Sequence, residues 1–160
     1  MRRTSFEEMH CSVAQTLEVV GEWWTLLIVR DLLLGVTRFD TFQERLGISR
    51  NILADRLETL VAHDIVEKVP YQERPVRYDY RLTAKGRDLW TVVTALREWG
   101  DRWVAPDGPP AEMVHRTCGH VAHVDPRCDH CGEPLTGAVT MRPGPGAGAD
   151  PVAGTAPNRD

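Results

Sequence analysis

Two helical patterns joined by a short turn constrain the fold of this chain more than any other feature. The first pattern, about Phe39–Leu46, ends at Gly47, a residue suited to a helix C-terminal cap. Ile48 turns the chain, and Ser49 is a good N-cap for a second helix that runs to about Ala62. Two helices joined by such a turn form the helix-turn-helix pattern, although an unrelated pair of antiparallel helices would leave the same signal.

The start of the second helix carries side chains suited to DNA. A recognition helix presents its N-terminal residues to base edges in the major groove, where Asn can pair with adenine and Arg with guanine. We expect major-groove and adjacent phosphate contacts from Ser49, Arg50, Asn51 and Arg56, and a DNA-backbone contact from Arg38. The opposite, apolar face of the helix carries Leu53, Leu57 and Leu60.

A two-stranded hairpin is predicted after this helix. Apolar and polar residues alternate in Val76–Leu82, with Arg77, Asp79 and Arg81 on the polar face, as in a half-buried strand. Ile65–Val69 can pair with it, with residues 70–75 as the loop. A helix-turn-helix followed by a hairpin is a winged helix. Basic and amide groups of the wing are expected to contact phosphate or the minor groove, and they are Gln72, Arg74 and Arg77.

Two further helices complete the expected domain. Gly21–Gly35 predicts a helix with apolar residues around most of its circumference, which places it at the centre of a domain or dimer. Thr83 caps a helix over residues 84–104, in which large apolar residues recur every three or four positions. That helix needs a partner surface. We expect a second copy of the chain, so that a homodimer forms through this helix and the N-terminal segment; packing on its own domain is the alternative.

The segment His115–Leu135 has the spacing of a metal site. Two pairs of candidate ligands are predicted to form turns: His115 with Cys118, and Cys128 with Cys131. In each pair the second residue is followed by Gly. Three thiolates and one imidazole fill a tetrahedral Zn²⁺ site and leave no open position, so structural zinc is expected. His120 or His123 could replace His115, and metal or oxidant sensing is the alternative role.

Composition and charge set broad limits. The chain is 42% hydrophobic, and it has no apolar run of the ~20 residues that span a bilayer, so no membrane partner is expected. Its start has no apolar stretch typical of a secretory signal, which favours a cytoplasmic protein. Residues 50–87 hold 8 basic and 6 acidic side chains, a weak basic excess. No nucleophile–base arrangement is present, so we do not expect an enzyme.

The expected fold class is mostly α with a small β-hairpin wing. We expect four parts: a winged helix-turn-helix domain for DNA binding and dimerisation, a linker, a zinc-ribbon-like module and a disordered tail. Their bounds are residues 5–104, 105–113, 114–140 and 143–160, respectively.

Several motifs within residues 10–104 together resemble the HxlR-type winged-helix regulators, a bacterial group related to the MarR type. They are a Cys before the first helix, Gly-x-Trp opening the central helix, Leu-x-x-Gly-x-x-Arg-Phe, Gly-Ile-Ser, and Arg-Tyr-x-Tyr-x-Leu-Thr-x-x-Gly. The resemblance implies a homodimeric regulator that binds double-stranded DNA at two-fold symmetric operators. This chain departs from the common pattern at Ser12, where the family often has Pro, and at Glu22, where it often has Lys or Arg.

The resemblance also makes Cys11 a candidate redox or electrophile sensor. Arg2, Arg3 and His10 would favour its thiolate, whereas Glu7 and Glu8 oppose it, and a buried structural Cys is the alternative. The function we expect is a repressor whose inducer the sequence leaves open. The rivals are a protein-interaction factor of the transcription machinery and a metal-responsive regulator.

Overall fold

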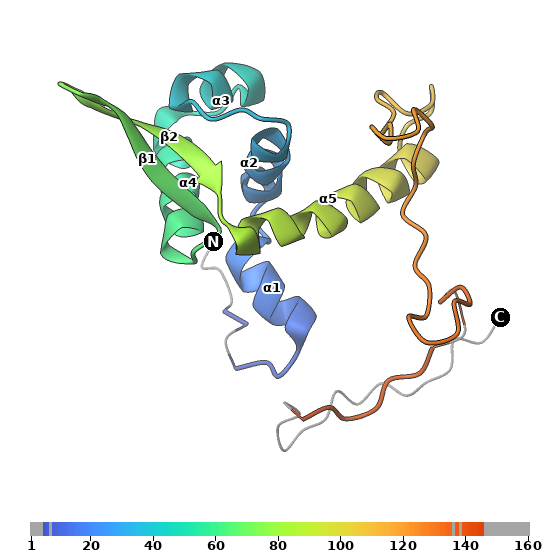
Figure 1. The fold of residues 1–160 in the computed structure, drawn as a ribbon. Helices are drawn as coiled ribbons and strands as arrows, with labels where there is room; N and C mark the ends of the chain where they lie inside the picture. Colours follow the sequence, from blue (N-terminus) through green and yellow to red (C-terminus); the bar gives the residue numbers. More distant parts are fainter. Residues whose placement is uncertain (1–4, 7, 136, 138, 146–160) are drawn as a thin grey trace.

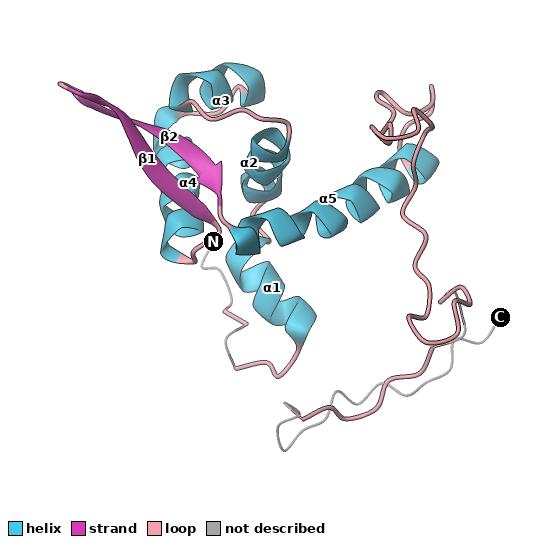
Figure 2. Ribbon diagram, viewed as in Figure 1, coloured by secondary structure: helices cyan, strands magenta, loops and turns pink. Residues whose placement is uncertain are grey.

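Five helices and one antiparallel hairpin make up the regular structure of the residues that the computed structural model describes, which are 5, 6, 8–135, 137 and 139–145 (Figures 1 and 2). In chain order they are α1 (Ser12–Val20), α2 (Trp23–Leu33), α3 (Phe39–Leu46), α4 (Arg50–Ala62), β1 (Val66–Glu73), β2 (Val76–Leu82) and α5 (Ala84–Trp103). The predicted fold class, mostly α with a hairpin wing, is confirmed. Within the same residues, no helix is both long and apolar enough to cross a bilayer.

Helix α2 lies at the centre of the domain, as its apolar circumference predicted. It contacts α3, α4, α5 and β2. Ile28 and Val29 are completely buried, and Trp24 packs against the same core. Trp23 is different, because 87% of its surface is exposed in the single chain. Trp24 therefore belongs to the core, whereas Trp23 lies outside it.

The turn between α3 and α4 forms as predicted. Gly47 adopts a left-handed conformation with φ of 66°, and its N–H donates to the Gln43 carbonyl at 2.9 Å. The Ser49 hydroxyl accepts from the Ile52 N–H at 3.3 Å and caps α4. The apolar face of α4 is completely buried through Leu53, Leu57 and Leu60. The opposite face and the first turn of α4 stay free of the core.

A buried carboxylate ties α2 to α3. Asp31 is completely buried, and it accepts from Arg30 at 2.8 Å and from the Arg45 Nε at 3.0 Å. The hydrogen bond and the charge of Asp31 raise the pKa of Arg45 above its ordinary value. A buried charge is costly unless it is paired, so the two guanidinium groups are what allow Asp31 to sit there.

Removing the charge of Asp31 should destabilise the domain. Asp31→Asn keeps the shape but loses charge-assisted hydrogen bonds, and we expect the free energy of unfolding to fall by about 1.5–3 kcal/mol. Denaturant unfolding at one fixed protein concentration measures this. The matched control is Asp88→Asn on the exposed side of α5, which should change the value by less than about 0.5 kcal/mol. Equal effects of the two substitutions would contradict the assigned role of Asp31.

The hairpin is longer than the sequence predicted. Residues 70–75 were expected to form a loop, but β1 continues through Glu73, which pairs with Val76. The strands pair from Val66–Leu82 outward, with an irregularity between Pro70 and Gln72. The ladder therefore continues past the core, and its outer half forms a protruding wing in which both faces are exposed (Figure 2).

The predicted polar face of β2 is only partly correct. Asp79 was expected on the outer face but is buried. The reason is a contact with the segment before α3: Asp79 forms an ion pair with Arg38 and accepts from the Thr37 hydroxyl at 3.3 Å. The Tyr80 N–H donates to the Thr37 carbonyl at 2.9 Å, so the segment before α3 forms a short β-bridge with β2.

Helix α5 begins against the domain and ends away from it. The Thr83 hydroxyl accepts from the Gly86 N–H at 3.1 Å, as the predicted cap requires. A Cβ at Gly86 would lie 2.1 Å from the Ile65 carbonyl oxygen, so only glycine allows this close approach. Figure 1 shows α5 running outward from the domain, with the following residues at its far end. Its last turns leave Trp99 61% and Trp103 69% exposed.

Beyond α5 the chain has no further helix among the described residues. Most of the expected tail, residues 146–160, lies outside the part of the chain that the structure describes.

Candidate nucleic-acid interface and Cys/His turns

The first turn of α4 presents polar side chains to solvent. Ser49, Arg50 and Asn51 are all exposed, because the buried leucines of α4 begin one turn later. In the described part of the chain, the Asn51 amide has no hydrogen-bond partner. The Ser49 oxygen accepts the capping bond, while its hydroxyl proton remains available. These three predicted residues are brought together at one helix start.

Arg50 is held in place by α3. Its guanidinium lies 3.2 Å from Asp40, 3.4 Å from the Gln43 side-chain oxygen and 4.9 Å from the centre of the Phe39 ring. The ion pair is exposed on both sides, with 66% and 68% of the two side chains accessible. Exposed pairs of this kind contribute ~0–1 kcal/mol, so a phosphate or a guanine edge can replace Asp40 as the partner.

Arg38 connects the start of α3 to the wing. Its guanidinium pairs with Asp79 and lies over the Tyr71 ring, 3.4 Å from the ring centre. The side chain is still 47% exposed, so it can contact a backbone phosphate while it holds the wing against α3. The sequence did not reveal the stacking on Tyr71, because nothing local predicts that residues 33 positions apart meet.

The wing carries two free cations near its tip. Arg74 and Arg77 are exposed, and neither forms an ion pair within the described residues. Gln72 was predicted as a third contact. Its amide nitrogen instead donates to the Arg74 and Pro75 carbonyl oxygens, both at 3.1 Å, and closes the tip. Only the amide oxygen of Gln72 remains for DNA, and Arg74 and Arg77 supply the charge.

Arg56 is separated from the other predicted contacts. Its side chain is only 22% exposed, and it lies 3.7 Å from Glu22 and 3.4 Å from Asp55. Its Nε atom is buried without a partner in the described residues. Arg56 was predicted to contact DNA, but its side chain is directed toward Glu22, just before α2. We therefore leave Arg56 out of the interface and assign it a structural ion pair.

The Cys/His segment forms two separate turns. In the first, the His115 Nδ1 lies 3.2 Å from the Cys118 sulfur. In the second, Cys128 and Cys131 lie on one turn. There, hydrogen bonds from the backbone of Cys131 and His130, and from the Cys131 side chain, lower the pKa of Cys128. No group of three or more potential ligands lies together among the described residues. The four predicted ligands thus lie in two separate pairs, and zinc binding stays a prediction.

The two alternative histidines have other partners. The His120 Nδ1 lies 3.0 Å from the Cys118 carbonyl oxygen, and the His123 Nδ1 lies 3.6 Å from a Glu98 carboxylate oxygen. His115 is the histidine whose ring nitrogen lies beside a cysteine sulfur. The geometry favours His115 as the ligand of the first turn.

The winged-helix architecture and its sequence together identify the family. The model of the HxlR-like helix-turn-helix family matches residues 19–108, from the end of α1 to the end of α5 and just beyond. The chain belongs to the HxlR-like helix-turn-helix family. It is therefore a DNA-binding transcriptional regulator, as the resemblance implied.

Relatives extend this family assignment beyond the winged domain. The uncharacterised HTH-type transcriptional regulator Rv3095 of Mycobacterium tuberculosis is 48% identical over 139 residues, which cover 84% of this chain and 87% of that protein. The crystal structure of PA1607, a candidate transcription factor, has 41% identity and a TM-score of 0.77, covering 88% of this chain and 99% of that one. Both matches cover a larger share of the chain than the winged domain alone.

A third relative covers a smaller part of this HxlR-family protein. The structure of the redox regulator HypR in its oxidized form has 33% identity and a TM-score of 0.52. It covers 56% of this chain and 94% of that one.

Cys11 lies directly before α1. Its N–H donates to the Met9 carbonyl at 2.8 Å, its own carbonyl accepts from Gln15 at 2.9 Å, and its side chain does not cap the helix. The thiol is half-buried and forms no disulfide. Of the charged neighbours considered from the sequence, Arg2, Arg3 and Glu7 lie outside the described residues.

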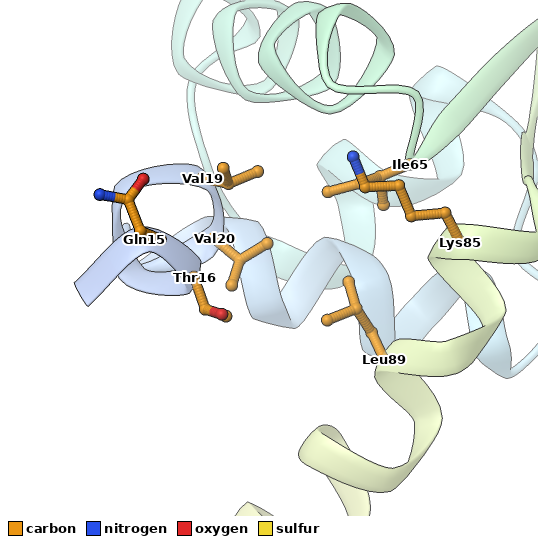
Figure 3. Close-up of a pocket in the computed structure, with 7 residues that line it drawn as sticks. All are labelled: Gln15, Thr16, Val19, Val20, Ile65, Lys85 and Leu89. Atoms are coloured by element: carbon orange, nitrogen blue, oxygen red, sulfur yellow. The ribbon is translucent and has the colours of Figure 1, made fainter. Parts of the chain in front are cut away.

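A small apolar groove lies between α1 and the start of α5 (Figure 3). Its volume is about 260 Å³, and Val19, Val20, Ile65 and Leu89 form most of its apolar lining. Typical small-molecule sites are roughly 300–1,000 Å³ and more enclosed. We therefore assign it no ligand.

Proposed function

We propose that this HxlR-family regulator is a homodimeric repressor that reads two-fold symmetric operators with the first turn of α4 and the wing. The observation that carries the proposal is one exposed surface that combines polar groups for bases with cations for phosphates. Arg50 and Asn51 would contact base edges, because they lie at the N-terminus of the recognition helix. Arg38, Arg74 and Arg77 would contact phosphates on either side.

The homodimer is supported by the apolar side chains that the single chain leaves exposed. Trp90, Leu96, Trp99 and Trp103 are each at least 46% exposed on α5. Val13 and Leu17 of α1 are also exposed. Several large apolar side chains exposed on one helix favour an association surface, because soluble monomers rarely expose large apolar patches. A second copy would cover both α5 and α1, as closed two-fold symmetry requires the same surface on both subunits.

Repression is the regulatory outcome that the DNA-binding surface alone can produce. A dimer that occupies a promoter blocks access of other proteins to that DNA. We propose repression on that ground.

Substitutions in the two parts of the interface should have different effects on DNA binding. Arg50→Ala combined with Asn51→Ala should weaken operator binding and relax base preference, with about 1–3 kcal/mol lost for each base contact. Arg77→Ala should weaken binding to all sequences alike and reduce the salt slope by about 1. Fluorescence anisotropy with operator and random duplexes at several salt concentrations measures both effects.

The control for those variants is Arg142→Ala, which removes one charge from an exposed residue after the Cys/His turns. Its affinity should equal that of the unmodified protein. If the Arg50/Asn51 double variant also binds the operator unchanged at fixed salt, the assigned base contacts are wrong. Binding to a protein of the transcription machinery without DNA affinity would favour an interaction factor instead.

A redox response through Cys11 is a second proposal, supported by the likeness to a structure described as a redox regulator. Sensor thiols must be accessible to the oxidant, and the Cys11 thiol is half-exposed at the start of α1. Because α1 borders the groove against α5, a change at Cys11 would reach the proposed dimer surface.

Diamide treatment tests the role of Cys11. The unmodified protein should lose operator affinity after treatment, and Cys11→Ser should keep it, because the oxidisable thiol is gone. Since the chain has three other cysteines, the control is Cys128→Ser with Cys131→Ser, which should still respond. A response that persists in Cys11→Ser and disappears in the control would assign the sensor to the Cys/His turns.

A further inference from the structure

The two Cys/His turns share one backbone hydrogen-bonding pattern. In the first, the His115 N–H donates to the His120 carbonyl at 2.9 Å, and the Gly119 N–H donates to the His115 carbonyl at 2.8 Å. In the second, the same positions repeat this pattern: Cys128 to Glu133 at 2.8 Å and Gly132 to Cys128 at 2.8 Å.

The equivalence extends to the glycines and the ends of the turns. Gly119 has φ of 73° and Gly132 has φ of 76°, so both turns close through a left-handed glycine. A single β-bridge joins the ends of each turn, Val114–Val121 in the first and Arg127–Pro134 in the second. The chain therefore forms the same two-ligand turn twice, with His115 in the place of Cys128.

The first turn has the ligand separation of half a zinc site. In a tetrahedral site with Zn–S of about 2.3 Å and Zn–N of about 2.0–2.1 Å, bound nitrogen and sulfur atoms lie about 3.5 Å apart. The His115 nitrogen and the Cys118 sulfur are 3.2 Å apart, close to that value. Structural zinc takes four ligands, so neither turn completes a site alone. Two turns must meet around one ion.

The first turn is fixed to the far end of α5. Glu98 of α5 accepts from the Val124 N–H at 2.6 Å, and Arg97 donates to the Ala111 carbonyl at 3.1 Å. The Ala122 N–H donates to the Met113 carbonyl at 2.8 Å, which closes the loop around the turn. These contacts attach the loop that contains His115 and Cys118 to the last turns of α5, which also carry the exposed Trp99 and Trp103.

The second turn stands apart from the rest of its own chain. The described hydrogen bonds of residues 126–135 all stay within residues 125–135, as in Arg127 to Asp125 and Leu135 to Pro126. Figure 1 shows it, in deeper orange, separated from the loops at the end of α5 by an extended stretch of chain. Within the described residues, its two thiols belong to no group of three or more potential ligands, so this turn alone would supply half of a site.

We propose that one Zn²⁺ ion is shared between two subunits, bound by His115 and Cys118 of one chain and by the partner's Cys128 and the partner's Cys131. The homodimer would hold two such ions, related by its two-fold axis. This proposal rests on the proposed homodimer. A second copy that covers the exposed Trp99 and Trp103 must lie beside the first turn, because that turn is fixed to the same end of α5. The extended stretch between the turns lets each chain reach across to its partner.

Mixed dimers of two full-length variants test the shared site. One chain carries His115→Ala with Cys118→Ser, the other carries Cys128→Ser with Cys131→Ser, and each carries a different tag without histidines. Neither variant alone can complete a site, so its homodimer should contain no zinc. After co-expression and purification through both tags, the heterodimer should contain one zinc ion per dimer, half of the wild-type content, measured by mass spectrometry of the metal.

One control dimer and one separate measurement accompany this test. A dimer that carries both tags on the same variant should contain no zinc. Light scattering measures dimer formation separately: a monomeric wild-type protein would overturn the homodimer and the shared site together. A dimeric protein whose mixed dimer stays free of zinc, while the wild type binds one ion per chain, would overturn the shared site and leave the proposed function standing. A wild-type dimer without zinc would also overturn the site.

Discussion

The buried carboxylate of Asp31 determines how the rest of the winged domain is arranged. It is completely enclosed in the central helix, and its charge is balanced by Arg30 of the same helix and Arg45 of α3. Because an unpaired charge there would be costly, α3 must pack where Arg45 can reach it. The position of α3 then sets the turn at Gly47 and the direction of α4. The exposed first turn of α4, and with it the DNA-binding surface, depends on this pairing.

A second ion pair fixes the position of the wing relative to α3. Asp79 on β2 pairs with Arg38, and Arg38 lies on the Tyr71 ring of β1. The wing is therefore joined to the start of α3 by charge and by stacking, rather than by the apolar core alone. Arg38 belongs both to the structure and to the proposed phosphate contacts, which couples the wing position to DNA binding.

The elements of the winged domain could be predicted from the sequence because their signals are local. The caps at Gly47, Ser49 and Thr83 and the leucine face of α4 each act within one or two turns of the chain. The polar pairs could not be predicted, since they join residues distant in the sequence. The sequence around Asp31 does not show that Arg45 of α3 pairs with it. For the same reason Asp79 was misplaced on an exposed face. The spacing of the Cys and His residues predicted which side chains could bind metal, but not that the two turns lie apart.

The central claim is that this HxlR-family protein binds operators as a two-fold symmetric dimer through α4 and the wing. Selection of bound duplexes from a random DNA pool tests it most directly. We expect enrichment of an inverted repeat whose half-sites lie about one helical turn apart, or a multiple of one turn. Substitution of Arg50 should then change the preferred bases at the same position in both halves. A pool without enrichment, or a single asymmetric site that is unaffected by Arg50, would contradict the account.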